Sequence, residues 1–349
     1  VISCPCALVI SIPLSFFGGI GGASKKGILV IGSNYLEALN KLDIIVFDKT
    51  GTLTKGVFKV TEIVPANGFS EGELLEYAAF AESLSNHPIA VSIQNAYDKP
   101  TKDIKLSDYI EIPGQGISVM LRGRKVLAGN DKLMEASGIG FEKSNKAGTK
   151  VYVAVDGRFA GCIIIADEVK ADSKETISQL KKLGVRKTVM LTGDNAQIGK
   201  AFSDELGLDE YYAELLPDQK VERLEILDKQ KRPKGKLAFV GDGINDAPVL
   251  ARADVGIAMG GLGSDAAIEA ADVVLMTDEP AKLIDAISIA KATKRIVLQN
   301  IAFALGIKGV FLVLGAFGVA GMWEAVFADM GVAIIAILNA MRVMNTKDI

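Results

Sequence analysis

Cysteine and histidine are scarce in this chain, which has three cysteines and a single histidine among 349 residues. Three cysteines cannot form a disulfide framework of the kind that stabilises small secreted domains. Two of them, Cys4 and Cys6, lie close together in an apolar run. We therefore expect a reduced protein that faces the cytosol.

The chain also lacks a large excess of charge of either sign, with a net charge of −3 at pH 7. Nucleic-acid-binding domains usually carry a basic surface, so the composition gives no support for a nucleic-acid partner. Hydrophobic residues make up 49% of the chain, charged residues make up 23%, and the mean hydropathy is +0.30. This combination predicts membrane-spanning segments joined to soluble domains, and the length allows two or three domains.

A third absence concerns the amino terminus. The chain begins at Val1 inside a hydrophobic segment, without an initiator methionine, a charged n-region or a signal-peptide cleavage site. We expect it to be part of a longer protein.

The segment Phe47–Gly56 reads Phe-Asp-Lys-Thr-Gly-Thr-Leu-Thr-Lys-Gly. The apolar run Ile44–Phe47 predicts a short buried strand that stops at Asp48, and Gly51 permits a sharp turn. Ligands bind at the carboxyl ends of strands in open parallel sheets, where a carboxylate can bind metal or attack phosphorus. Soluble phosphatases with such a loop usually carry a second aspartate where this chain has Thr50. Without that acid, a phosphorylated Asp48 should hydrolyse slowly.

The whole string matches the phosphorylation motif of P-type ATPases, and the chain resembles that family. The resemblance implies that ATP phosphorylates Asp48 and that hydrolysis of the phosphoenzyme resets the pump.

The apolar run Val1–Gly22 contains no charged residue and is followed by Lys25 and Lys26. About 20 such residues span a bilayer, and lysines mark the cytoplasmic end of a span. We expect a membrane helix within residues 1–24.

This run contains Cys4-Pro5-Cys6. Residues i and i+2 of a regular helix point in different directions, so the two thiolates can share one ion only if Pro5 unwinds the helix. Two buried structural cysteines beside a kink are the alternative. Cys-Pro-Cys resembles the transmembrane site of heavy-metal P-type ATPases, which implies that Cys4 and Cys6 bind the transported ion.

Residues 57–166 differ in pattern from the segments on either side. The predicted elements are strands at Lys59–Val64, Val151–Val155 and Phe159–Ile165, a hairpin turn at Asp156-Gly157 and a helix at Ser70–Ser83. They predict a separate α+β domain inserted into another domain.

The candidate ligand groups of the inserted domain are Glu82, His87, Gly114, Gly116, Gly129 and Asn130. Each is a weak signal alone, because a Gly-x-Gly is usually a turn and a lone histidine is more often structural or solvated. Together and in this order they match the nucleotide-binding domain of heavy-metal ATPases. The resemblance implies that they hold the adenine end of ATP.

From residue 167 to residue 295 helices and strands alternate. The predicted elements are helices at Ser173–Leu183 and Ala196–Leu206, a helix that begins at Pro217, and strands at Thr188–Leu191 and Lys236–Val240. Such alternation predicts βαβ units and a doubly wound parallel sheet. The resemblance to P-type ATPases implies that this is a haloacid-dehalogenase-like phosphorylation domain. The domain has two parts, residues 25–56, which include a helix at Ser33–Asn40, and residues 167–295.

Two further strand ends should join Asp48 at the same edge of this sheet. One precedes Thr192-Gly193-Asp194 and the other precedes Asp242, with Asn245 and Asp246 just beyond. Because Mg²⁺ prefers oxygen ligands, we expect Asp242 and Asp48 to share it. Lys220 can neutralise charge on the phosphoryl group, although a solvated helix lysine is the alternative.

Both strings match P-type ATPase signatures. The resemblance implies a catalytic set of Asp48, Thr50, Thr192, Gly193, Asp194, Lys220, Asp242, Asn245 and Asp246, with Mg²⁺ at Asp48, Thr50 and Asp242.

The last part of the chain predicts a helix at Ile284–Arg295 and then, within residues 296–345, two spans at Val297–Val319 and Met322–Val343. Basic residues flank the pair on its outer ends, which puts both ends in the cytoplasm and predicts a hairpin.

Lys308 and Asp329 lie at similar depths in these two spans. An unpaired charge at a helix centre costs roughly 2.5 to 3.5 kcal/mol on insertion scales, so we expect the two side chains to pair. A purely structural ion pair is the alternative. Asn300, Lys308 and Asp329-Met330-Gly331 resemble the subgroup that exports zinc, cadmium and lead, which implies that Asp329 is an ion ligand and Lys308 a counter-charge.

The sequence therefore indicates the C-terminal portion of a heavy-metal P-type ATPase that uses ATP and Mg²⁺ to export Zn²⁺, Cd²⁺ or Pb²⁺. We expect a multi-pass protein of the cell membrane with cytoplasmic catalytic domains. Its expected partners are the bilayer, the ion, ATP and the N-terminal part of the same pump, with its actuator domain. A copper-exporting P-type ATPase, a soluble phosphatase of the same fold and a non-catalytic metal-binding fragment stay open as alternatives.

Overall fold

The structure is a computed structural model, and it describes residues 6–100, 106–144, 146, 148–242, 246–260, 265–319 and 321–344. The chain divides into two compact units, one formed by Val1–Leu53 with Lys170–Ile349 and the other by Thr54–Val169. The second unit is thus inserted into the first. The sequence predicted an insertion at residues 57–166; the observed unit is slightly longer because its first and last strands pair with each other from Thr54 and Val169 onward.

A mixed, mostly parallel sheet forms the centre of the larger unit. In the described residues it has seven strands in the order β1-β13-β12-β11-β2-β9-β10, and only the pair β1 and β13 is antiparallel. The strands are β1 Ile28–Val30, β2 Leu42–Asp48, β9 Lys187–Leu191, β10 Glu210–Tyr212, β11 Lys236–Gly241, β12 Val255–Met259 and β13 Val273–Leu275. The cores of β2, β9 and β11 were predicted from apolar runs, and β2 lies between the other two strands in the sheet.

Helices alternate with these strands, as a doubly wound fold requires. They are α2 Ser33–Leu39, α6 Ser173–Lys182, α7 Ala196–Leu206, α8 Pro217–Asp228, α9 Ala247–Arg252 and α10 Asp265–Ala270. Helix α7 starts where its N-cap, Asn195, accepts a 2.9 Å hydrogen bond from the Ile198 amide. Side chains of β2 and β11, such as Val46 and Phe239, are fully buried in the core of this unit. Their packing holds the two strands, and therefore the residues at their carboxyl ends, in place.

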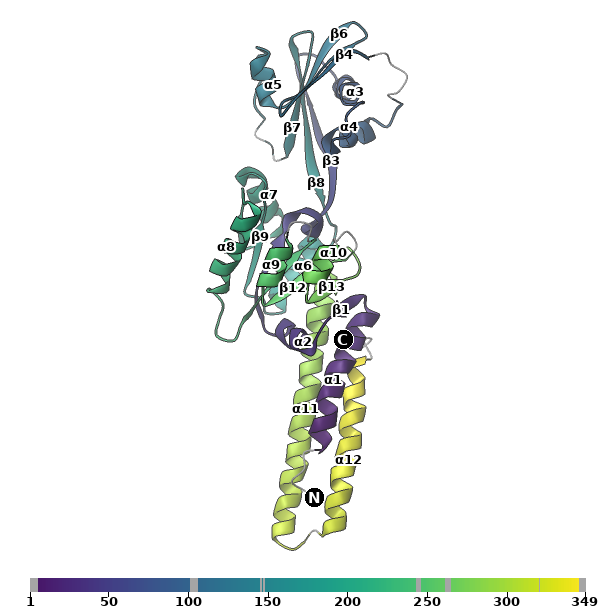
Figure 1. The fold of residues 1–349 in the computed structure, drawn as a ribbon, viewed down its shortest axis with the longest axis vertical. Coiled ribbons are helices and arrows are strands. Elements are labelled where there is room, and N and C mark those ends of the chain that lie inside the picture. Colours follow the sequence, from purple (N-terminus) through teal and green to yellow (C-terminus); the bar gives the residue numbers. More distant parts are fainter. Residues whose placement is uncertain are drawn as a thin grey trace. The chain divides into compact units, whose positions relative to one another are not determined.

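Three helices of the larger unit are long and apolar enough to cross a membrane, among the residues that the structure describes. They are α1 Cys6–Lys25, α11 Lys282–Ala316 and α12 Met322–Met341, and a short 3₁₀ turn, Arg342–Met344, follows α12. These helices lie side by side, and α11 and α12 form a hairpin (Figure 1).

The prediction that a helix ends at Arg295 is wrong, because α11 runs without interruption from Lys282 to Ala316. Residues 290–300 contain neither glycine nor proline. The change from charged to apolar composition at this point alters the surroundings of the helix, and nothing there breaks its hydrogen bonds.

The inserted unit is built on an antiparallel sheet with, among its described residues, six strands in the order β3-β8-β7-β6-β5-β4. Its elements are β3 Thr54–Pro65, α3 Glu71–Ala81, α4 Pro88–Tyr97, β4 Leu106–Ile112, β5 Gly116–Leu121, β6 Arg124–Gly129, α5 Asp131–Ala136, β7 Thr149–Val155 and β8 Arg158–Val169. Asp156 and Gly157 form the predicted hairpin turn, with φ angles of 50° and 77°.

Alternate residues of β7 enter two different cores of this unit. Val151 and Val153 pack with α3 and α4 on one face, and Tyr152 packs with α5 on the other face. Figure 1 shows these helices on the two sides of the sheet. The inserted unit therefore has a hydrophobic core of its own.

Candidate active site

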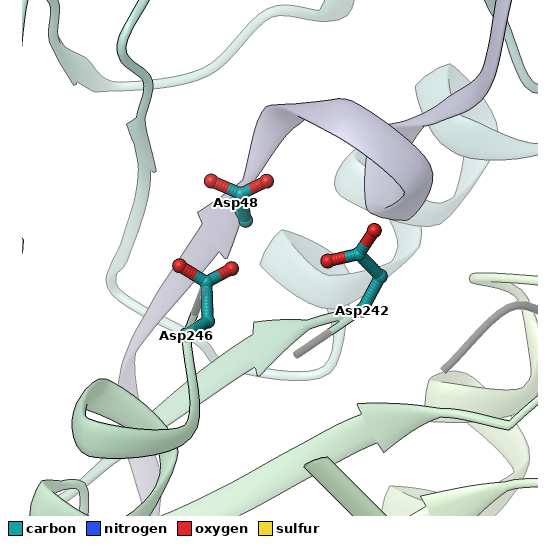
Figure 2. Close-up of side chains that lie close together, drawn as sticks. All are labelled: Asp48, Asp242 and Asp246. Atoms are coloured by element: carbon teal, nitrogen blue, oxygen red, sulfur yellow. The ribbon is translucent and has the colours of Figure 1, made fainter. Parts of the chain in front are cut away.

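Three carboxylates meet at the carboxyl end of the larger sheet. Asp48 is the last residue of β2, Asp242 directly follows β11, and Asp246 immediately precedes α9. One oxygen from each lies within 4.8 Å of the others, and Figure 2 shows the three side chains facing a common space. This is the cluster that the sequence predicted from the ends of its apolar strands.

The strand register explains why these residues converge. Strands β11 and β9 both run parallel to β2, with Val240 opposite Phe47 and Leu191 opposite Asp48. The residues that follow each strand therefore leave the sheet at one edge, where ligands bind in open α/β sheets.

Lys220, near the start of α8, links two members of the cluster. Its Nζ donates to Asp48 Oδ1 at 2.6 Å and to Asp246 Oδ1 at 2.8 Å. Burial raises the pKa of Asp48 to about 7, and the charge of Asp246 adds to this, while Lys220 opposes both. Burial lowers the pKa of Lys220, but the two carboxylates outweigh it and the net shift is upward. Lys220 is therefore a fixed cation beside Asp48, and the solvated-lysine alternative does not describe it.

The turn after Asp48 brings the backbone against Asp242. Gly51 has a φ of +71°, and a Cβ at this position would overlap the Asp242 carboxylate. In Figure 2 the ribbon that follows Asp48 turns back toward Asp242. The side chain of Thr50, the predicted third magnesium residue, is exposed on this turn.

The predicted Thr192-Gly193-Asp194 string follows β9 at the same edge. Thr192 is buried, and its Oγ1 accepts a 3.1 Å hydrogen bond from the Asp194 amide. Asp194 forms an ion pair with Lys49, whose ammonium also lies 5.2 Å from the centre of the Phe202 ring. Gly193 is exposed.

The structure does not describe the side chains of three predicted site residues. Cys4 and Asn245 lie outside the described residues, as does Pro5. Cys6 begins α1, but its side chain is not described.

The inserted unit contains the predicted nucleotide residues in one place. A cavity of about 320 Å³ is lined by all six of them, Glu82, His87, Gly114, Gly116, Gly129 and Asn130. Gly116 on β5 and Gly129 on β6 lie opposite each other, and a Cβ on either would overlap the backbone of the other strand or its turn. The glycines thus permit a close backbone approach at the cavity wall.

Two acids face this cavity. Burial, followed by the charge of Glu111, raises the pKa of Glu82 to about 7. His87 is the N-cap of α4, where its Nδ1 accepts a 3.3 Å hydrogen bond from the Ile89 amide. The cavity therefore offers a carboxyl that gains a proton near neutrality and an imidazole held by the helix end.

A charge pair links α11 and α12. Lys308 Nζ lies 3.0 Å from Asp329 Oδ1, and each side chain is 13% exposed. This is the pair that the depths of the two charges predicted. Asn300 is buried a little over two turns earlier in α11 and donates a 3.0 Å hydrogen bond to the Ala336 carbonyl of α12.

Two residues of these sites are not among the predicted set. Lys49 lies inside the phosphorylation string and could have been noted as a cation beside Asp48. Glu111 also lines the inserted unit's cavity, and the only signal that could have found it is its position just before the Gly114 turn. Lys49 pairs with Asp194, and Glu111 acts on Glu82. Both neighbours are distant in sequence, so a local pattern does not reveal them.

Comparisons with known proteins agree with this geometry. A family model described as haloacid dehalogenase-like hydrolase matches residues 42–254. The chain is 61% identical over 348 residues to a cadmium, zinc and cobalt-transporting ATPase of Bacillus subtilis, with 100% of this chain and 50% of that protein covered. It is 59% identical over 344 residues to a zinc-transporting ATPase of Synechocystis, with 98% and 47% covered.

Solved structures give the same result. A crystal structure of a zinc-transporting PIB-type ATPase in the E2.Pi state matches with a TM-score of 0.87 and 39% identity, over 98% of this chain and 56% of that one. The catalytic domain of the CPx-ATPase CopB-B matches with a TM-score of 0.59 and 31% identity, over 76% and 96%.

The chain belongs to the haloacid dehalogenase-like hydrolases and, among them, to the heavy-metal-transporting P-type ATPases. It spans about half the length of the curated relatives that it matches. The predicted family and fold class are confirmed, and the candidate spans together with the family make it a membrane protein.

Proposed function

We propose that this chain is the C-terminal half of a pump that uses ATP to export a divalent heavy-metal ion, Zn²⁺, Cd²⁺ or Pb²⁺, through an aspartyl phosphate at Asp48. The observation that carries the proposal is the position of Asp48 at the end of β2, with a buried lysine within 2.6 Å and two further carboxylates beside it. The Bacillus subtilis relative transports cadmium, zinc and cobalt, and the Synechocystis relative transports zinc, which supports this class of ion.

In the proposed reaction Asp48 Oδ attacks the γ-phosphorus of ATP. A carboxyl oxygen–phosphorus bond forms, and the bond between phosphorus and the β,γ-bridging oxygen breaks, releasing ADP. Lys220 stabilises the charge on the transferred group, and the Thr192 hydroxyl donates to one of its oxygens. Thr50 supplies no acid for hydrolysis, so the acyl phosphate should persist while the protein changes conformation.

The cluster fits Mg²⁺, because carboxylate oxygens are the ligands that this ion prefers. Asp48 and Asp242 are the proposed magnesium residues, and Asp246, the third carboxylate of the cluster, pairs with Lys220. Thr50 is a further candidate on the same loop. When bound, Mg²⁺ supplies positive charge to the phosphate oxygens.

The cavity of the inserted unit is the proposed ATP site. Gly116 and Gly129 let strands β5 and β6 come close together at the cavity, and Glu82 and His87 are suited to hydrogen-bond the base. We assign the adenine end of ATP to this cavity because all six predicted residues line it.

The proposed transport site combines the thiolates of Cys4 and Cys6 with Asp329. Two soft ligands and one hard oxygen suit divalent zinc or cadmium better than monovalent copper. Lys308 is not a ligand while protonated. Its 3.0 Å contact with Asp329 supports a role as the counter-charge that balances this carboxylate when no ion is bound.

In this proposal the protein is a multi-pass protein of the cell membrane with its catalytic units in the cytoplasm, and the N-terminal half of the pump is its partner. A copper exporter and a non-catalytic metal-binding fragment remain the competing functions. The three candidate spans disfavour a soluble phosphatase.

A panel of ions separates these functions. In the full-length protein, Zn²⁺ and Cd²⁺ should stimulate ATP hydrolysis more than Cu⁺, and Asp329→Ala, Cys4→Ala and Cys6→Ala should each remove the stimulation. Phosphorylation of these variants from inorganic phosphate should survive, because the cytoplasmic site is unchanged. Greater stimulation by Cu⁺, or full zinc stimulation of Asp329→Ala, contradicts the assigned ion.

A further inference from the structure

Lys170 is a buried lysine that the phosphoryl-transfer scheme above does not use. It directly follows β8, at the point where the chain re-enters the larger unit, and it is 4% exposed. Its Nζ donates to the Gly51 carbonyl at 2.8 Å and to Asp278 Oδ1 at 2.6 Å. A buried ammonium is costly unless it is paired and hydrogen-bonded, so both contacts should persist in the folded protein.

The first contact holds the turn that follows Asp48. The Lys170 amide donates to the Leu53 carbonyl at 3.1 Å, and Ser173 Oγ donates to the same carbonyl at 2.8 Å. Two carbonyls of the turn, those of Gly51 and Leu53, are therefore fixed from one short segment. A Cβ on Gly51 would overlap the Asp242 carboxylate, so the turn and this carboxylate lie close together. The hydrogen bond from Lys170 to the Gly51 carbonyl therefore also sets the spacing between them.

The second contact reaches the start of a membrane helix. Asp278 lies between β13 and α11, the helix that carries Lys308. In the same place the Ala281 amide, at the N-cap of α11, donates to Asp172 Oδ2 at 2.8 Å. Lys170 thus joins the phosphorylation turn to the segment that leads into α11.

We propose that Lys170 is a positioning residue for phosphoryl transfer, and that its ion pair with Asp278 couples the phosphorylation turn to α11. The proposal rests on the proposed function of Asp48. A shift of α11 that withdraws Asp278 leaves a buried ammonium without its counter-charge, and the Gly51 carbonyl then becomes its remaining partner. The geometry of the turn therefore depends on the position of α11.

The test is Lys170→Met in the full-length protein, with the exposed Lys174→Met as the matched control. Loss of hydrogen bonds from a charged donor should lower kcat for ATP hydrolysis by about 10- to 100-fold. KM for ATP should change by no more than about twofold, because the ATP cavity lies in the inserted unit and Lys170 does not line it. Lys170→Arg, which keeps the charge and the donors, should recover part of kcat.

Asp278 provides the second measurement. If the two residues act as a unit, Asp278→Ala combined with Lys170→Met should lower kcat little further than Lys170→Met alone, whereas independent effects multiply. Should Lys170→Met fail to fold, Asp278→Asn, whose side chain is partly exposed, should still lower kcat several-fold at an unchanged KM.

Four results separate the possibilities. A Lys170→Met enzyme as active as the Lys174→Met control, or multiplying effects in the double variant, overturns this inference. A kcat that Lys170→Arg does not raise above that of Lys170→Met also overturns it. Failure of the wild-type protein to phosphorylate Asp48 overturns the proposed function instead.

Discussion

Asp48 and Glu82 are both buried carboxyl groups whose pKa is raised to about 7 by burial first, yet their surroundings differ. Asp48 is paired with Lys220, which opposes the upward shift and keeps a carboxylate available as a nucleophile. Glu82 forms no ion pair with any cation of the described residues, and Glu111 adds to its shift. A cation thus accompanies the proposed nucleophile, and none accompanies the proposed base-recognition group.

The pKa of Glu82 makes the stability of the inserted unit depend on pH. Its folded value of about 7 lies above the ordinary 4.5, so the unfolded chain ionises first as pH rises. The contribution of neutral Glu82 to the free energy of unfolding should be fully present below pH 4.5. It should fall as the pH rises to about 7, by about 3 kcal/mol at most. We expect Glu82→Gln in residues 54–169 to remove this fall, as measured by urea unfolding at pH 5 and pH 8.

The exposed Glu142→Gln is the control for Glu82→Gln, and it should keep the pH dependence of the wild type. If Glu82→Gln loses stability between these pH values as the wild type does, then Glu82 is not the group responsible.

His87 should contribute to ATP binding through its place in the cavity wall. In residues 54–169, ATP should shift the backbone amide resonances of Glu82, His87 and Gly116, and His87→Ala should weaken binding by about tenfold, the effect of losing one ligand hydrogen bond. Because the α4 N-cap is also lost, the helix resonances serve as the check on folding. Equal ATP affinity of His87→Ala, with the three residues unperturbed, assigns ATP to another surface.

At the scale of elements, apolar runs and end signals predicted the strands that carry the site. Ile44–Phe47, Thr188–Leu191 and Lys236–Val240 all lie in observed strands, since each is bounded by turn residues and buried on both faces. Strands β12 and β13 and helices α4 and α5 were not predicted, because they are short and their apolar patterns do not separate strand from helix.

Strand ends predicted which carboxylates lie close together, but they did not predict the contacts of Lys170. Asp48, Asp242 and Asp246 follow from strand ends, whereas the contact of Lys170 with Gly51 and Asp278 joins three distant segments and leaves no local pattern. The sequence also did not predict that α11 is continuous. The composition changes from charged to apolar at Arg295, whereas the backbone stays helical through this residue.

Asn300 belongs to a polar link between α11 and α12. Its Nδ2 donates to the Ala336 carbonyl, and its Oδ1 accepts a 2.9 Å hydrogen bond from Asn339. Asn300→Ala should destabilise the hairpin by about 1 kcal/mol, a typical value for such bonds in membranes. Thermal inactivation in lipid nanodiscs measures this loss, with Leu305→Ala, at an exposed position of the same helix, as control. Equal inactivation of the two variants would show that the link contributes nothing to stability.

At the scale of the whole molecule, the proposed ATP binding and the proposed phosphorylation belong to different compact units. The inserted unit has its own core and the proposed ATP cavity, while the larger unit holds the carboxylate cluster and the candidate spans. Because β3 and β8 pair at the boundary, residues 54–169 should fold as an isolated domain and bind ATP without hydrolysing it. In the proposed reaction, hydrolysis requires Asp48, which belongs to the other unit.

The central claim is that ATP phosphorylates Asp48, and a labelling experiment tests it most directly. The full-length protein, incubated with γ-labelled ATP, Mg²⁺ and Zn²⁺, should acquire an acid-stable label that hydroxylamine removes, as expected of an acyl phosphate. Asp48→Asn should acquire no such label, because the amide cannot act as the nucleophile. A hydroxylamine-sensitive label that persists in Asp48→Asn would contradict the account.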